Sequence, residues 1–340
     1  MKKLSIYLIG LLLVPALFLT SCDSGDDPGT TTVATPAFTL MTDYMVQNNL
    51  DVNNILTNTD GQKFVVAAPA TLGEVDAFLN TYYIMDIRSQ SAFDGAHLAG
   101  ANRVDFANIL TAAATATKPI LVVCYSGQTA CYATALLRMY GYPSTRALKW
   151  GMSGWNPNTA ASWNNNIGTH ANGHTNWSMD PIAPTPSIFS DPVISSSLTS
   201  GEAILKQRVE AVVGSTNGFG DATVSGADVI ASPGNYFINN YFSDTDYAGF
   251  GHIDGAQRIN PFTLADNSYL SLDPDANNLV TYCYTGQTSA VLTATLRVLG
   301  YNAKTLTFGM NGMYNDNPAW TSNKWSASVS KDYPVSETGS

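Results

Sequence analysis

The sequence predicts an α/β fold that occurs twice in one chain, with a central, mostly parallel sheet flanked by helices in each copy. Two observations predict it. Four short blocks recur in the same order at nearly constant offsets of 155 to 159 residues. Within each copy, apolar stretches of strand character alternate with a helical stretch, which is typical of a parallel α/β sheet. Because solenoid repeats are much shorter than this period, the pattern indicates a duplicated domain.

The repeated blocks also locate the two domains. A proline-rich spacer at residues 181–186 separates the copies, so we expect a first repeat at residues 37–182 and a second repeat at 187–336. Each repeat ends in a stretch rich in Trp and Asn, which we expect to be a surface wrap with little regular structure. The matching blocks are residues 97–104 with 252–259, 124–129 with 283–288, 137–142 with 296–301, and 150–154 with 308–312.

Each repeat is expected to contain strands and a long helix in a fixed order. The first strand is apolar and aromatic, a composition that favours β-structure. In the first repeat the second strand is a continuous apolar run, as expected for a strand covered on both faces. The helix ends at Gly141 or Gly300, because glycine adopts the left-handed cap without strain. We expect strands at residues 82–86, 119–123 and 144–148 with a helix at 130–140, and strands at 236–238, 279–282 and 303–306 with a helix at 289–299.

The N-terminus indicates a secretory signal. Two lysines precede an apolar run at residues 4–19, which is shorter than the ~20 residues of a membrane span. A short anchor helix that stays attached is the alternative. The Leu-Thr-Ser-Cys ending is similar to a bacterial lipoprotein processing box, which implies cleavage before Cys22 and a lipid on that cysteine. We therefore expect a signal peptide at residues 1–21, a flexible tether at 22–36, and a lipid-anchored location in the bacterial cell envelope, facing the periplasm or the surface.

Composition excludes two classes of protein. The formal net charge is −10, with 16 basic and 26 acidic residues, which argues against nucleic-acid binding because a phosphate backbone needs a basic surface. Four cysteines in 340 residues are too few for a disulfide scaffold. Apolar residues make up 45% of the chain, which is enough to bury a sizeable core.

Cys124 and Cys283 are the candidate catalytic residues. Each directly follows the second strand of its repeat, and ligand sites of α/β sheets gather at the carboxyl ends of strands. The N–H groups of the loop and the positive end of the next helix favour an anion, so we expect the thiol pKa to fall below the free value of ~8.5. An inert buried cysteine is the alternative, but recurrence in both repeats favours a reactive one. The loops that would cradle a persulfide comprise Tyr125, Ser126, Gly127, Gln128 and Thr129, and Tyr284, Thr285, Gly286, Gln287 and Thr288.

These motifs resemble the rhodanese family in its tandem-domain form, over nearly the whole chain after the signal. Both loops fit Cys-x-x-Gly-x-Thr, residues 251–256 fit Gly-His-Ile-x-Gly-Ala with a variant at 96–101, and residues 86–88 fit Asp-x-Arg at a strand end. The resemblance implies a sulfurtransferase with two rhodanese-like domains and no cofactor. Its cysteine takes a sulfane sulfur from thiosulfate, a polysulfide or a persulfide, holds it as a persulfide, and passes it to a thiol or cyanide.

The chain departs from the family pattern at basic residues. Neither loop carries the Arg or Lys that many thiosulfate-using relatives place there, and Asn239 and Tyr241 replace the Asp-x-Arg pair in the second repeat. Other arginines would therefore have to bind an anionic donor, and a salt bridge at the sheet edge is the alternative for each. The candidates for donor binding are Arg88, Arg103 and Arg258.

Further motifs leave alternatives open. Cys131 is either a packed helix residue or a resolving thiol that forms a disulfide with Cys124. His170 and His174 lie in a glycine-bearing loop and make a weak metal site, so no metal is expected. Two other classes of function remain: a non-catalytic lipoprotein that carries or binds a persulfide, and a structural protein that uses the two folds as an interaction scaffold.

Overall fold

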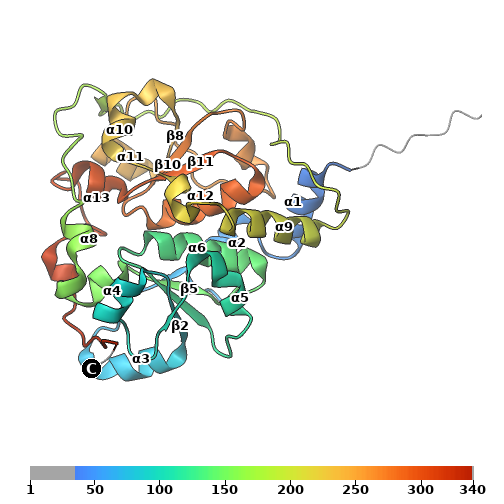
Figure 1. Ribbon diagram of the computed structural model, residues 1–340. Helices are drawn as coiled ribbons and strands as arrows, with labels where there is room; N and C mark the ends of the chain where they lie inside the picture. The colour runs from blue at the N-terminus through green and yellow to red at the C-terminus, as the bar shows by residue number, and fades with distance from the viewer. Residues whose placement is uncertain (1–34, 339–340) are drawn as a thin grey trace, which may run out of the picture. The chain divides into compact units, whose positions relative to one another are not determined.

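The described part of the chain is residues 35–338, which belong to one compact unit in the computed structural model (Figure 1). Both repeats lie within it. None of its helices has the length and apolar character that crossing a membrane requires. The predicted signal peptide, Cys22 and nearly all of the predicted tether lie outside the described residues, so the lipid anchor and the envelope location stay predictions.

Each repeat is built on its own parallel sheet. The strands of the first sheet are β1 (Val65–Val66), β2 (Tyr83–Asp86), β3 (Asn102–Arg103), β4 (Ile120–Val123) and β5 (Arg146–Leu148), and those of the second are β7 (Thr223–Val224), β8 (Phe237–Asn240), β10 (Leu279–Tyr282) and β11 (Ala303–Leu306). The orders are β1-β5-β4-β2-β3 and β7-β11-β10-β8, and all of these pairs are parallel. The strands β4 and β10 are buried along their whole length, which explains their continuous apolar sequences.

Helices flank both sheets, and the predicted fold class is confirmed. The helices of the first repeat are α1 (Ala37–Gln47), α2 (Val52–Leu56), α3 (Val75–Thr81), α4 (Gln90–Gly95), α5 (Ile109–Ala113), α6 (Gln128–Tyr140), α7 (Gly151–Trp155) and α8 (Ala161–Asn164), and those of the second are α9 (Gly201–Val213), α10 (Gly226–Ala231), α11 (Asp244–Phe250), α12 (Gln287–Leu299) and α13 (Gly309–Tyr314). The long helices α6 and α12 begin two residues earlier than predicted, directly after Gly127 and Gly286.

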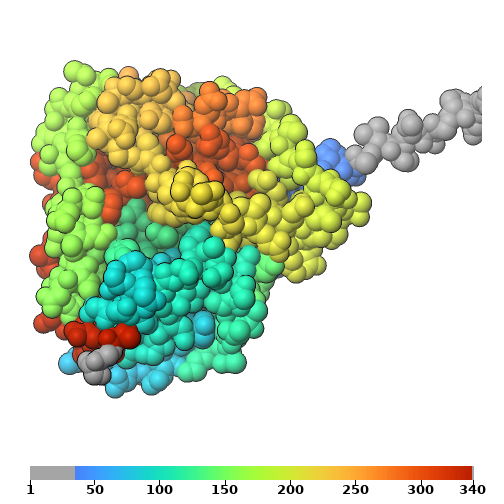
Figure 2. Space-filling view, viewed as in Figure 1, coloured from blue at the N-terminus to red at the C-terminus, as the bar shows by residue number. Residues whose placement is uncertain are grey.

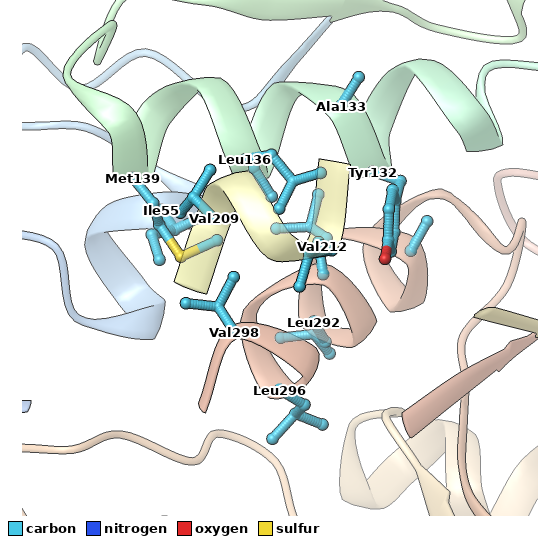
Figure 3. Packing of buried hydrophobic residues seen from close by; sticks show 14 of the residues in the cluster. Ile55, Tyr132, Ala133, Leu136, Met139, Val209, Val212, Leu292, Leu296 and Val298 are labelled. Atoms are coloured by element: carbon cyan, nitrogen blue, oxygen red, sulfur yellow. The ribbon is translucent and has the colours of Figure 1, made fainter. Parts of the chain in front are cut away.

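The two repeats share one apolar core. Helix α6 of the first repeat packs against α9 and α12 of the second, and α1 packs against α9. Figure 3 shows how Leu136, Val209 and Leu292, all buried, fill the space between α6, α9 and α12. Burying such a side chain stabilises a fold by about 1.5–3 kcal/mol. The shared core therefore holds both repeats in one unit, independently of the spacer that joins them.

Each repeat also places its last segment on the other repeat. The first arm, residues 166–180, pairs β6 (Trp177–Ser178) with β9 (His252–Ile253) of the second repeat in an antiparallel ladder. The second arm, residues 326–338, returns to the first repeat, where Ser336 and His97 exchange backbone hydrogen bonds of 2.8 and 2.9 Å. Figures 1 and 2 show the first arm in yellow-green along the second repeat and the second arm in dark red along the first. His97 and His252 are thus equivalent docking points for exchanged arms.

Candidate functional site

The two cysteine loops lie at the carboxyl ends of β4 and β10. Gly127 (φ 88°) and Gly286 (φ 73°) adopt the left-handed conformation that favours glycine, and each immediately precedes α6 or α12. Because the chain turns at these glycines, the first turn of the helix faces back toward the cysteine.

The sulfur of Cys124 accepts two backbone hydrogen bonds. The N–H of Gly127 lies 3.1 Å from Sγ and the N–H of Ala130 lies 3.3 Å from it. Ala130 is in the first turn of α6, where N–H groups have no partner within the helix, so the sulfur takes a free donor at the positive end of the helix. Ala130 lies outside the predicted cradle, since the helix begins two residues earlier than its sequence pattern indicates.

The sulfur of Cys283 has a different environment. It accepts one backbone hydrogen bond, from the N–H of Ser289 at 3.3 Å, and the thiol donates to Ser289 Oγ at 3.5 Å. Ser289 occupies the position equivalent to Ala130, and its hydroxyl also shares a 2.6 Å hydrogen bond with Thr305 Oγ1. The sulfur of Cys283 therefore has one backbone donor and a hydroxyl beside it, whereas the sulfur of Cys124 has two backbone donors.

The two loops contact each other across the repeat interface. Gln128 Oε1 accepts a 2.7 Å hydrogen bond from the N–H of Phe308 in the second repeat. A Cβ atom on Gly286 would overlap with the Gln128 amide, and one on Gly127 would lie 3.1 Å from Gln287 Cδ. A side chain at either position would therefore displace the facing glutamine, in addition to straining the left-handed turn. The sequence carries no signal for this contact, because Gln128 and Phe308 are 180 residues apart.

An aromatic cluster closes the interface beside the first loop. Trp163 donates from Nε1 to the carbonyl of Ser126 at 3.0 Å, and its ring stacks on Trp325 with centroids 5.2 Å apart. Both tryptophans are fully buried, so the expected surface location is wrong for these two side chains, which meet where the ends of the two repeats come together, whereas most of the residues around them are exposed. The cluster comprises Trp150, Trp163, Phe308 and Trp325.

Burial decides the acidity of Cys124. Cys124 is only 2% exposed and Cys283 only 1%. Burial raises the pKa of the Cys124 thiol, while the N–H groups of Ala130, Ser126 and Gly127 oppose the rise. The predicted fall of the thiol pKa is therefore wrong for Cys124, because loss of hydration outweighs the backbone donors in this closed arrangement.

We expect Cys124 to be alkylated slowly by iodoacetamide at neutral pH, with a rate that keeps rising above pH ~8.5, where a free cysteine levels off. The reason is that the reagent attacks the thiolate and burial keeps the thiol protonated. Mass spectrometry of peptides from the folded protein, alkylated at a series of pH values, would measure the rate at each cysteine. The urea-unfolded chain is the reference, and a folded-state rate that levels off at lower pH than in that reference would contradict the prediction.

The three predicted anion-binding arginines all have acidic partners. The guanidinium of Arg88 is buried and lies 5.7 Å from the centre of the Tyr125 ring, so it is beside the first loop. To bind a donor anion, each arginine would have to bind it in addition to its carboxylate partner or in place of that partner. Donor binding by these arginines stays a prediction. The ion pairs are Arg88–Asp86 at 2.7 Å, Arg103–Asp105 at 2.5 Å, and Arg258–Asp244.

The other predicted loop residues mostly bond within the site. Thr129 and Thr288 are half-buried in the first turns of α6 and α12, and a cavity of about 590 Å³ lies beside Thr129. The polar contacts are Tyr125 Oη with Ser89 Oγ at 2.9 Å, Gln128 Nε2 to Ser126 Oγ at 3.0 Å, Gln287 N to Thr285 Oγ1 at 3.3 Å, and Tyr284 Oη to Asp246 Oδ2.

Cys131 is a fully buried thiol of the shared core. It and Cys124 are both free, so the disulfide considered as an alternative is not formed in this structure. Burial raises the pKa of Cys131 well above its usual value. As for metals, residues 35–338 contain no group of three or more His, Cys, Asp or Glu side chains that could hold one.

Both repeats match one protein family. A family model described as a rhodanese-like domain matches residues 71–158 and 242–316, and each match contains one cysteine loop. A thiosulfate sulfurtransferase of Pseudomonas fluorescens (strain SBW25) is 34% identical over 74 residues, covering 21% of this chain and 68% of that protein. The chain belongs to the rhodanese-like family. The family resemblance of the loops is thereby confirmed.

Solved structures similar to this rhodanese-like protein are distant from it. A thiosulfate sulfurtransferase from Pseudomonas aeruginosa is 16% identical and covers 79% of this chain and 48% of its own, with a TM-score of 0.28. A 3-mercaptopyruvate sulfotransferase from Escherichia coli is 12% identical and covers 72% of this chain and 98% of its own, with a TM-score of 0.26. The family assignment rests on the sequence matches.

Proposed function

We propose that this rhodanese-like protein is a sulfurtransferase in which Cys124 carries the sulfur as a persulfide. One observation carries the proposal: the N–H groups of Gly127 and Ala130 point at Cys124 Sγ, at the end of a buried strand, and such donors also favour a terminal persulfide anion. The similarity to a thiosulfate sulfurtransferase supports it. The donor is thiosulfate, a polysulfide or a persulfide, and the acceptor is a thiol or cyanide.

The transfer takes two displacement steps. The Cys124 thiolate attacks the outer sulfur of the donor, a new S–S bond forms on Cys124, and the donor's S–S bond breaks with its electron pair leaving on the rest of the donor, as sulfite if the donor is thiosulfate. The acceptor, a thiolate or cyanide, then attacks the outer sulfur of the persulfide. The electron pair returns to Cys124, and a persulfide or thiocyanate leaves.

The closed arrangement of the loops sets a condition on this chemistry. A thiol that is 2% exposed cannot meet a donor until the facing loops separate or side chains beside them move. The cavity beside Thr129, bounded by residues 105–107 of the first repeat and 213–220 of the second, offers an approach to the first turn of α6. Opening would also hydrate Cys124, which removes the cause of its raised pKa and releases the thiolate.

The test compares single cysteine variants. Cys124→Ser is expected to reduce thiocyanate formation from thiosulfate and cyanide to background and to remove the persulfide adduct of about 32 Da from the peptide that contains Cys124. Cys283→Ser is expected to keep at least about half of the activity, since Cys283 Sγ accepts only one backbone hydrogen bond and Cys124 Sγ accepts two. Cys131→Ala is the control, because it removes a buried thiol that belongs to neither loop. If Cys124→Ser is as active as the parent, the proposal is wrong.

The burial of both cysteines favours a second candidate, a carrier that holds a persulfide without turnover. Both functions need Cys124, but they differ in the fate of the persulfide after it has formed. A carrier would show a stable adduct on Cys124 and negligible release to cyanide or to small thiols, whereas an enzyme would lose the adduct as soon as an acceptor is added.

A further inference from the structure

Two arginines of the second repeat line a cavity far from the cysteine loops. Arg208 on α9 and Arg297 on α12 line a cavity of about 270 Å³, together with Ser215 and Asn302. Arg297 lies ten residues after the start of α12, which at 1.5 Å per residue is roughly 15 Å along the helix from the loop of Cys283. The cavity is therefore separate from the proposed sulfur site.

The two guanidinium groups have hydrogen-bond partners but no counter-charge. Arg208 donates from Nε and Nη2 to the carbonyls of Val298 and Arg297, both at 2.9 Å, and Arg297 donates from Nη1 to the carbonyl of Ala303 at 3.3 Å. Within the described range 35–338, neither arginine forms an ion pair with a carboxylate. Arg297 Nε is buried without a partner. Since each guanidinium has five donors, both keep several unused.

The first repeat shows how the same position is satisfied by protein alone. Arg138 is the equivalent of Arg297, and it donates from Nε, Nη1 and Nη2 to the carbonyls of Thr145, Ile55 and Gln62 at 2.9, 2.9 and 3.2 Å. Both arginines line a cavity, but in the second repeat Arg297 donates to a single carbonyl and otherwise lies beside the Tyr132 hydroxyl. Compared with Arg138 at the equivalent position, Arg297 therefore has more N–H donors without a carbonyl partner.

The cavity lies at the C-terminal ends of α9 and α12, each of which carries about half a negative charge, so two full guanidinium charges still leave it net positive. Burial and the neighbouring charge of Arg297 both lower the pKa of Arg208, so the two cations destabilise each other in the absence of a counter-ion. A guanidinium binds oxyanions through paired N–H groups, and a hydroxyl and an amide on the same cavity wall add neutral donors. Two positive charges match a ligand with two negative charges.

We propose that this cavity, the Arg208–Arg297 pocket, binds a small tetrahedral oxyanion of charge −2, of which sulfate and hydrogen phosphate are the representatives. The proposal does not depend on sulfur transfer at Cys124. The bound anion would lie beside the packed ends of α9 and α12, where it neutralises the two cations and stabilises the second repeat.

The test uses a variant that fills the pocket with its own charge. Ala211 is exposed on α9, lines the pocket and lies one turn after Arg208, so Ala211→Glu places a carboxylate beside the two guanidinium groups without removing either. Ala211→Gln is the matched control, with the same size and no charge. Sulfate and phosphate are each titrated into the full chain, with sodium chloride added to the reference to keep the ionic strength equal.

We expect sulfate or phosphate to raise the melting temperature of the parent and of Ala211→Gln in a saturable manner, and isothermal titration calorimetry to give a Kd at least tenfold weaker for Ala211→Glu. If one anion binds more strongly than the other, that anion is the better representative of the ligand of the pocket. An Ala211→Glu variant that binds as tightly as the parent would overturn the proposal, as would a parent that responds to sulfate and phosphate no more than to chloride.

Discussion

Replacing Arg88 by methionine is expected to destabilise the protein by about 3–5 kcal/mol, because it leaves a buried carboxylate without its partner. Asp86 is completely buried at the end of β2 and Arg88 is 3% exposed. The guanidinium donates to both carboxylate oxygens at 2.7 to 3.1 Å and also to the carbonyl of Ala96 at 2.6 Å. Equilibrium unfolding in urea would measure the loss.

The second repeat supplies the compensating pair for this experiment. In the structure the equivalents of Asp86 and Arg88 are Asn240 and Phe242, one residue after the expected Asn239 and Tyr241, because Asp86 and Asn240 pair with the residues directly before the two cysteines. Neither carries a charge, and Asn240 Oδ1 accepts from the N–H of Phe242 at 2.9 Å while Nδ2 donates to the Tyr282 hydroxyl at 2.8 Å. The double variant Asp86→Asn with Arg88→Phe is therefore expected to recover at least half of the stability lost in Arg88→Met. A double variant less stable than Arg88→Met would show that the ion pair is needed for more than neutralising Asp86.

Tyr333→Ala is expected to lower the free energy of unfolding by about 3–5 kcal/mol, the usual loss for deleting a buried aromatic ring. Although Tyr333 belongs to the second repeat in sequence, we expect the first repeat to be destabilised. Tyr333 is on the second arm, residues 326–338. It is 5% exposed, packs edge-on against Trp155 of the first repeat at 5.2 Å, and donates from Oη to the carbonyl of Pro69 at 2.7 Å. Trp155 Nε1 in turn donates to the carbonyl of Pro334 at 2.8 Å.

Hydrogen exchange would locate the effect of this substitution. We expect the amides of β4 and α6 in the first repeat to lose protection, because the arm covers a face of that repeat. Leu72→Ala is the control, since Leu72 is exposed and its replacement is expected to change the stability by less than about 0.5 kcal/mol. Unchanged protection of β4 together with fraying of residues 326–338 alone would contradict a structural role for the exchanged arm.

Several features of the site follow from local sequence. The strand before Cys124 is a continuous apolar run and the strand before Cys283 is mostly apolar, and β4 and β10 are accordingly buried along their whole length. The glycine three residues after each cysteine predicts a turn, and the structure places Gly127 and Gly286 there with positive φ. The Cys-x-x-Gly-x-Thr spacing indicates the same family that the match to the rhodanese-like domain shows. The sequence pattern places the start of α6 at Ala130 and the structure places it at Gln128, so the sequence assigns Ala130 to the helix and not to the donors around the sulfur.

By itself, the sequence determined the duplication, the parallel α/β units, the two cysteine loops and the family, because each is carried by short local motifs whose order and recurrence can be read along the chain. Only the tertiary structure decided how the repeats meet. The exchanged arms, the hydrogen bond from Phe308 to Gln128 and the burial of both thiols join residues far apart in sequence, for which no local pattern exists. The direction of the Cys124 pKa shift was also decided by the tertiary structure. Burial raises this pKa, and the other repeat helps to complete that burial. The backbone N–H groups of the loop and of the first turn of α6 lower it, but by less.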